Sequence, residues 1–218
     1  MPGLYSSLIV MHIAGGSTGL IAGTTAAITR KGNRRHRFAG KAFFYGMLLA
    51  SLSAGLLSWL PGHENIFLFA VGGFTLYMIC SGYRAIFQKR QWKSGEGLPI
   101  WDALVTLFGA GFGSCLLYLA VQLLRSTGLF GLVPMVFALV CLFFARADLQ
   151  LVLGKTTVKH RWLTNHISRM MGALIASYTA FLVVNVQIQQ QWILWLLPTL
   201  VGGFFIRYFL RKYTHTNK

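Results

Sequence analysis

Seven stretches of apolar residues constrain this chain more than any other feature, because each has about the length that a helix needs to cross a bilayer. A spanning helix takes about 20 mostly apolar residues. The seven stretches cover residues 4–29, 38–60, 65–87, 99–124, 128–148, 166–187 and 192–211. The sequence therefore predicts an all-α fold, a seven-transmembrane-helix bundle that forms a single integral membrane domain over residues 1–218.

The scarcity of charge excludes the main soluble classes. Only 11% of the 218 residues are charged, whereas a soluble domain has about 25%. So few charged side chains cannot cover the surface of a soluble enzyme or keep a chain disordered. The three cysteines (Cys80, Cys115 and Cys141) all fall within apolar stretches and form no C-x-x-C motif, so the sequence predicts no disulfide framework.

The basic residues predict an orientation. With the N-terminus outside, 19 of the 20 lysines and arginines fall on the cytoplasmic side, and Arg125 is the exception. Basic residues gather in cytoplasmic loops of membrane proteins, so we expect a cytoplasmic C-terminus in a bacterial cytoplasmic membrane. The net charge of +16 is thereby explained by anionic headgroups of the inner leaflet, and we expect no nucleic-acid partner.

Three short matches suggest an internal repeat. They relate residues 31–37 to 155–161, residues 46–54 to 172–180, and residues 71–74 to 201–204. The matches predict a three-plus-one-plus-three plan, with parallel repeats over 1–90 and 128–212 and a connecting helix over 99–124. Parallel repeats occur in carriers, although the common composition of membrane helices explains such short matches equally well.

Two acids are expected to find partners inside the bundle. Asp102 and Asp148 lie within apolar stretches, where an unpaired carboxylate costs several kcal/mol. The cations available at a similar depth are Arg84, Arg169, His36 and His166. We therefore expect an ion-pair or proton-carrying cluster in the cytoplasmic half, and a purely structural ion pair remains open as the alternative.

Histidines supply the other candidate site. The candidate ligand-binding residues lie on the second and sixth stretches, and the candidate metal ligands are histidines near the cytoplasmic ends. In the outer half His12 is a further candidate, although a satisfied core histidine is its default interpretation. The ligand-binding candidates are His36, His166, Arg169, Ser177 and Asn185, and the metal candidates are His36, His160 and His166.

One segment resembles a family of bacterial predicted multi-pass membrane proteins of unknown function. The similar residues are the W-L-x-x-H-I-x-R-M-x-G-A and A-F-L-V-V-N motifs within residues 162–185, together with His36, Arg37 and Gly40. The resemblance implies that His36, His166, Arg169 and Asn185 matter, and it implies no activity.

Three better-known classes fit less well. The overall plan is loosely similar to PQ-loop carriers, but the Pro-Gln dipeptide is missing. Ceramidase-like zinc hydrolases need a histidine motif in the last span, which has no histidine here. Two-haem b-type cytochromes need an outer histidine pair, for which the chain offers His12 and the loop residue His63.

Several functions remain open at this point. The residues favour a carrier-like or small-ligand-binding membrane protein, because charged groups converge at the inner ends of the helices. The alternatives are a haem b redox protein, a non-catalytic assembly or lipid-interacting protein, and an intramembrane zinc hydrolase with Asp102 and Asp148 among its ligands. Whether the protein is an enzyme, and whether it holds haem or zinc, is not decided by these residues.

Overall fold

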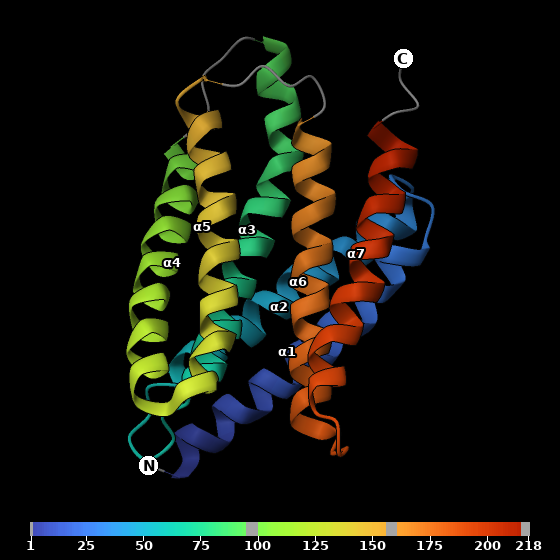
Figure 1. Ribbon diagram of the computed structural model, residues 1–218. Helices are drawn as coiled ribbons and strands as arrows, with labels where there is room; N and C mark the ends of the chain where they lie inside the picture. The colour runs from blue at the N-terminus through green and yellow to red at the C-terminus, as the bar shows by residue number, and fades with distance from the viewer. Residues whose placement is uncertain (1, 95–99, 156–160, 215–218) are drawn as a thin grey trace.

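A computed structural model describes residues 2–94, 100–155 and 161–214, and these form seven α-helices and one short 3-10 helix (Figure 1). All seven α-helices are long and apolar enough to cross a membrane. The predicted all-helical fold with seven helices of spanning length is thus confirmed. The helices are α1 (Pro2–Ile28), α2 (Arg34–Leu57), α3 (Ile66–Ser94), α4 (Ile100–Thr127), η1 (Gly128–Gly131), α5 (Leu132–Val152), α6 (Arg161–Asn185) and α7 (Trp192–Thr214).

Some helices extend beyond the predicted apolar stretches. Helix α6 begins at Arg161, five residues before the predicted start, and α3 continues to Ser94. Hydropathy locates the apolar part of a helix, whereas the backbone hydrogen bonds of the helix continue through polar residues until a residue that ends the helix. Between α4 and α5 the stop is Gly128, whose φ of 68° suits a residue without Cβ.

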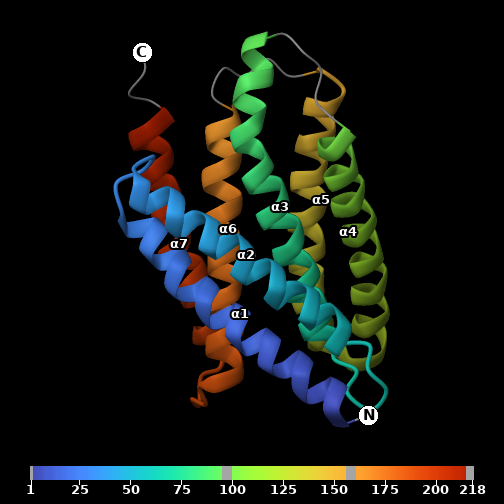
Figure 2. The same cartoon turned by 180° about the vertical axis from the view of Figure 1, so that it is seen from behind.

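Successive helices run in alternating directions, as Figures 1 and 2 show from opposite sides. The start of α2, α4 and α6 therefore lies at the same end of the bundle as the C-terminal end of α7. We call this the basic end, because the helix ends gathered there carry many cations. Among them are Arg30, Lys31, Arg34, Arg35, Arg37, Lys89, Arg161, Arg211 and Lys212.

Helix α3 is the centre of the bundle. It contacts α2, α4, α5 and α6, and its residues Tyr77, Met78 and Ile79 are almost fully buried. Helices α1 and α2 form a hairpin that crosses the other helices obliquely (Figure 2). Helix α7 packs mainly against α6, and Trp195 also meets Phe67 of α3, so most of its surface is left to face lipid.

The α1–α2 hairpin is held together by a close backbone approach. A Cβ atom added at Gly15 would lie 2.7 Å from the carbonyl oxygen of Gly46, and one added at Gly46 would lie 2.9 Å from that of Gly15. Small residues permit such contacts between membrane helices. Gly15 therefore serves helix packing here, whereas a Cβ atom added at Gly16 would meet no atom within 4 Å.

The two halves of the chain do not have equivalent helix neighbours. Helix α1 packs along α2, whereas α5, its predicted counterpart, packs along α4. Helices α5 and α6 meet through side chains such as Asp148 and Arg169. The packing therefore does not show the three-plus-one-plus-three repeat, which stays a prediction from the sequence.

Candidate functional site

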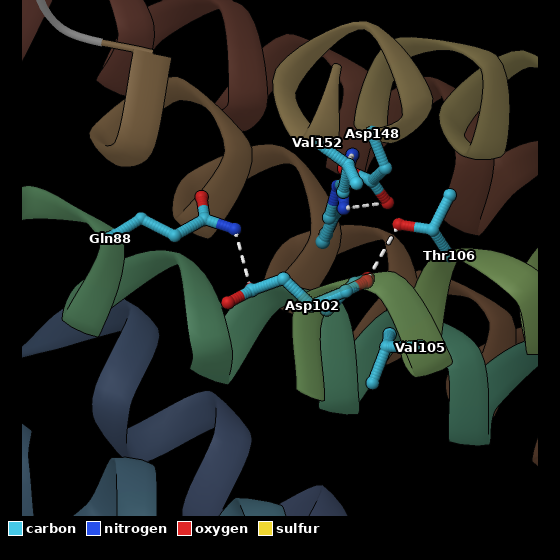
Figure 3. Close-up of a pocket in the computed structure, with 8 residues that line it drawn as sticks. Gln88, Asp102, Val105, Thr106, Asp148 and Val152 are labelled. Carbon is cyan, nitrogen blue, oxygen red and sulfur yellow. Dashed lines mark hydrogen bonds and ion pairs between the residues drawn. The ribbon is translucent and has the colours of Figure 1, made fainter. Parts of the chain in front are cut away.

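The two intramembrane acids lie in one buried cluster where α3, α4, α5 and α6 meet near the basic end (Figure 3). We call this the polar cluster. In the close-up, Gln88 and Thr106 converge on Asp102, and Asp148 lies across the cavity from Asp102. The members of the cluster are Tyr77, Ser81, Arg84 and Gln88 of α3, Asp102 and Thr106 of α4, Asp148 of α5 and Arg169 of α6.

Asp148 is matched by one arginine and one tyrosine. Its Oδ2 atom accepts hydrogen bonds from Tyr77 Oη at 2.6 Å and from Arg169 Nη1 at 2.7 Å. Arg169 Nη2 lies 2.6 Å from the other carboxylate oxygen, as an ion-pair contact without hydrogen-bond alignment. Arg169 is 1% exposed, so its charge depends on this carboxylate rather than on water.

Asp102 is held from α3. Arg84 Nη2 donates to its Oδ2 atom at 2.7 Å, and Gln88 Nε2 donates to its Oδ1 atom at 2.8 Å. Thr106 donates its hydroxyl to the backbone oxygen of Asp102 at 2.8 Å. The sequence predicted partners for the two acids among four cations, and the structure places an arginine on each.

A small cavity separates the two ion pairs. Its volume is about 10 Å³, which is room for roughly one water molecule. Four buried polar atoms of the cluster have no hydrogen-bond partner within the described parts of the chain: Gln88 Oε1, Arg84 Nε, Arg169 Nε and Arg169 Nη2, the last of which makes only the ion-pair contact with Asp148. Buried polar atoms are rarely left unsatisfied, so this region is suited to hold water or a small polar ligand.

A second arrangement, the histidine pair, consists of His36 of α2 and His166 of α6. Their ring centroids lie 6.5 Å apart with an interplanar angle of 82°. His36 Nδ1 lies 3.0 Å from the backbone oxygen of Ala26, and His166 Nδ1 lies 2.9 Å from that of Gly82. A carbonyl oxygen can only accept, so each neutral ring carries its proton on Nδ1 and keeps an acceptor lone pair on Nε2.

Lys31 lies close to the histidine pair, in the connection between α1 and α2. Its Nζ atom donates to the backbone oxygens of Ala26 at 3.0 Å and Ala27 at 2.5 Å, and it lies 4.2 Å from the ring centroid of Phe209. Burial lowers the pKa of Lys31 to about 8. The Lys31 ammonium group thus binds the last carbonyl groups of α1 beside the two imidazoles.

Other candidates from the sequence lie outside both arrangements. Ser177 donates to Ala173 O within its own helix and touches the sulfur of Met47. Asn185 is exposed at the far end of α6, about 28 Å along the helix axis from His166. Helix geometry therefore places these two residues outside both arrangements, and a role for them in ligand binding stays a prediction from the sequence.

The outer histidines are anchored separately. His12 Nδ1 bonds the backbone oxygen of Ala50 at 2.9 Å, whereas His63 stacks on Tyr5 at 3.9 Å between ring centroids. This matches the default interpretation of His12 as a satisfied core residue. His160, the third metal candidate, lies outside the described residues.

The ligand set of a zinc hydrolase is not assembled in the described ranges. No group of three or more His, Cys, Asp or Glu side chains comes together there. Asp102 and Asp148 bind arginines rather than the histidines with which they were grouped as zinc ligands. Charge explains this, because a buried guanidinium requires a carboxylate more strongly than a neutral imidazole does.

Four members of the polar cluster were not among the candidates from the sequence: Tyr77, Ser81, Gln88 and Thr106. Tyr77 is fully buried and donates to Asp148, and Gln88 is 6% exposed and donates to Asp102. Both were detectable as positions on the same helix face as Arg84, since Tyr77 lies two turns before it and Gln88 one turn after it. An uncharged polar side chain in an apolar helix was too weak a signal on its own.

Comparisons with protein-family models, with curated proteins and with solved structures found no match to this chain. The resemblance of the 162–185 segment to a bacterial membrane family thus rests on the sequence motifs alone.

Proposed function

We propose that this multi-pass membrane protein is a carrier that binds a small anion at the polar cluster and couples its binding to protonation of Asp148. The observation that supports this most directly is that two ion-paired acids and Arg169, from three helices, line one cavity. Ionisable groups inside membrane spans are costly and mark substrate or proton pathways. A single structural ion pair would not need a shared polar cavity.

Arg169 is the anion-binding group in this proposal, and Asp148 acts as its internal anion. A guanidinium holds a carboxylate or a phosphate with the same set of donors. When Asp148 takes up a proton, it no longer neutralises Arg169, and an incoming anion replaces it. Proton and anion then bind together, which keeps the net charge of the cluster at zero.

The small size of the cavity fits a state of such a cycle in which no anion is bound. A volume of about 10 Å³ admits roughly one water molecule and no larger anion. Binding therefore requires the helices around the cavity to separate. The cluster lies nearest the basic end, so we propose entry from that end.

We propose that the basic end faces the cytoplasm of a bacterial cell, with the N-terminus outside. This follows from the asymmetric distribution of lysines and arginines. These cations also provide contacts for anionic headgroups of the inner leaflet. A reporter fused after Lys218 should be active in the cytoplasm, and activity on the outer side would contradict the orientation. The internal repeat is not needed for this function.

The experiment compares ligand stabilisation across pH. The purified protein is screened with short monocarboxylates, dicarboxylates and inorganic phosphate, and the melting temperature is measured at pH 5.5, 7.0 and 8.5. We expect one anion class to stabilise the wild type most at pH 5.5. Asp148→Asn mimics the protonated acid, so its stabilisation by that anion should be strong at all three pH values.

Two further variants make the screen decisive. Arg169→Gln should lose the stabilisation by the anion, and Arg125→Gln should keep it, because Arg125 is exposed at the other end of α4. Uptake of the same anion into proteoliposomes, followed with a pH-sensitive dye, should acidify the lumen. If no anion stabilises the wild type, or if Arg169→Gln responds like the wild type, the cluster only locks helices and the assembly or lipid-interacting alternative gains support.

A further inference from the structure

The histidine pair is a second site that the proposed carrier function does not use. His36 and His166 come from different helices, yet their rings lie 6.5 Å apart. Within the described parts of the chain, the hydrogen bonds of both rings involve Nδ1. Each Nε2 atom therefore presents an unused lone pair.

The backbone bonds give both imidazoles the arrangement that metal-binding histidines have. A histidine that binds a metal through one nitrogen commonly donates its other N–H to a carbonyl or carboxylate, which fixes the tautomer and the orientation of the ring. Ala26 O does this for His36, and Gly82 O does it for His166. The two rings are thus oriented before any metal arrives.

The separation of the rings distinguishes two coordination geometries. A metal lies about 2.0–2.1 Å from the imidazole nitrogen, and therefore roughly 3.2 Å from the ring centroid. Two imidazoles on opposite sides of one metal then have centroids about 6.4 Å apart, whereas two tetrahedral ligands have centroids about 5.2 Å apart. The observed 6.5 Å matches ligation from opposite sides.

Local charge disfavours a divalent ion. Lys31 lies close enough to raise the electrostatic cost of any positive charge at both histidines. The described parts of the chain place no third His, Cys, Asp or Glu ligand beside the pair. A metal that brings its own anionic ligands avoids this cost, and the porphyrin of haem does so while its propionates suit basic neighbours.

The surroundings also leave room beside the pair. A Cβ atom added at Gly40, one turn after His36, meets no atom within 4 Å. No Cα atom of α2 comes within 8 Å of a Cα atom of α6 in the described ranges, so side chains alone bridge these two helices at the pair. A porphyrin ligated by both histidines requires such a separation.

We propose that His36 and His166 bind one metal centre through their Nε2 atoms, from opposite sides, and that this centre is the iron of haem. The shared chemistry is a metal held by two imidazoles. A free Cu(I) ion, which accepts two nitrogen ligands in a line, is the other source of that chemistry.

The test titrates the full-length protein in detergent with hemin, and separately with Cu(I) under reducing conditions. We expect hemin to bind one equivalent, with the low-spin absorption and EPR spectra of iron ligated by two histidines. His36→Gln and His166→Gln should each weaken hemin binding at least tenfold and abolish the low-spin spectrum. Glutamine keeps an N–H donor for the backbone carbonyl. These variants therefore remove the metal ligand while they keep the hydrogen bond that the folded protein makes at this position.

Matched controls use residues with the same local features. His12→Gln removes a histidine that is also bonded to a backbone oxygen but has no second histidine partner, and it should bind hemin like the wild type. Gly40→Leu should block hemin, whereas Gly55→Leu on the same helix, also with open space beside it, should not. Asp148→Asn, which alters the proposed carrier site, should leave hemin binding unchanged.

Two results would overturn the haem assignment. Binding of Cu(I) without hemin, lost in both pair variants and retained in Gly40→Leu, would assign the site to a free ion instead. If hemin and Cu(I) bind His36→Gln and His166→Gln as they bind His12→Gln, the pair is no metal site at all. Either result leaves the anion-binding proposal untouched, because it depends on Arg169 and Asp148.

Discussion

The polar cluster and the histidine pair lie near the same end of the bundle, but they handle their polar groups in opposite ways. In the polar cluster each acid faces an arginine, and the cavity between the pairs admits about one water molecule. In the histidine pair each ring uses one nitrogen and leaves the other without a protein partner in the described ranges.

The difference follows from charge. An ionised side chain in an apolar bundle must be neutralised by an opposite charge, so the acids and arginines of the cluster neutralise one another. A neutral imidazole costs far less to bury with one nitrogen unused. A membrane protein can therefore keep an open binding position at histidine, while charged residues become available only after protonation or rearrangement.

The largest expected effect comes from breaking the matched pair. Arg169→Met should lower the free energy of unfolding by about 3–5 kcal/mol, because it leaves the buried Asp148 carboxylate without its cation. A triple variant, Tyr77→Phe with Asp148→Leu and Arg169→Met, removes every polar member of this pair and should recover most of the loss. Reversible unfolding in mixed micelles measures both. A triple variant as unstable as the single one would contradict the idea that charge matching decides the stability.

A smaller effect is expected at the second pair of the cluster. The Arg84 side chain is 24% exposed, whereas that of Arg169 is 1% exposed. Water and Gln88 can replace part of what Arg84 provides to Asp102. Arg84→Gln should therefore cost about 1–2 kcal/mol in the same unfolding assay. A loss of stability equal to that of Arg169→Met would show that side-chain exposure does not determine how much each ion pair contributes to stability.

The smallest effect concerns the unmatched cation beside the histidine pair. The pKa of Lys31 is lowered by burial from 10.5 to about 8, so between pH 8 and 10.5 the unfolded chain binds more protons than the folded one. Stability from this group therefore rises with pH across that window. The melting temperature of the wild type should rise relative to that of Lys31→Gln between pH 8 and 10.5. A constant difference between the two proteins would show that Lys31 titrates normally.

Much of the fold could be predicted from local patterns. The seven spans were found because the burial of about 20 apolar residues is decided within each segment. The need of Asp102 and Asp148 for partners was also predictable, since the cost of an unpaired charge in an apolar helix does not depend on the rest of the fold. Orientation relative to the cell is likewise a prediction from the distribution of charge.

The selection of partners could not be predicted in the same way. The sequence offered four cations for two acids, and the packing of α3 against α4 and of α5 beside α6 gives Arg84 to Asp102 and Arg169 to Asp148. Tyr77 reaches Asp148 because α3 lies at the centre of the bundle. Such contacts depend on how helices rotate and cross, which no local pattern encodes.

The sequence by itself determined that this chain forms seven helices long and apolar enough to cross a membrane and that its ionisable residues cluster toward one end. Both properties depend on hydropathy and charge along single helices. The tertiary structure alone decided which backbone oxygens fix His36 and His166, and that these two rings lie 6.5 Å apart in a nearly perpendicular arrangement. Carbonyl groups are present at every residue, so only the packing of α1 and α3 against these helices selects Ala26 and Gly82.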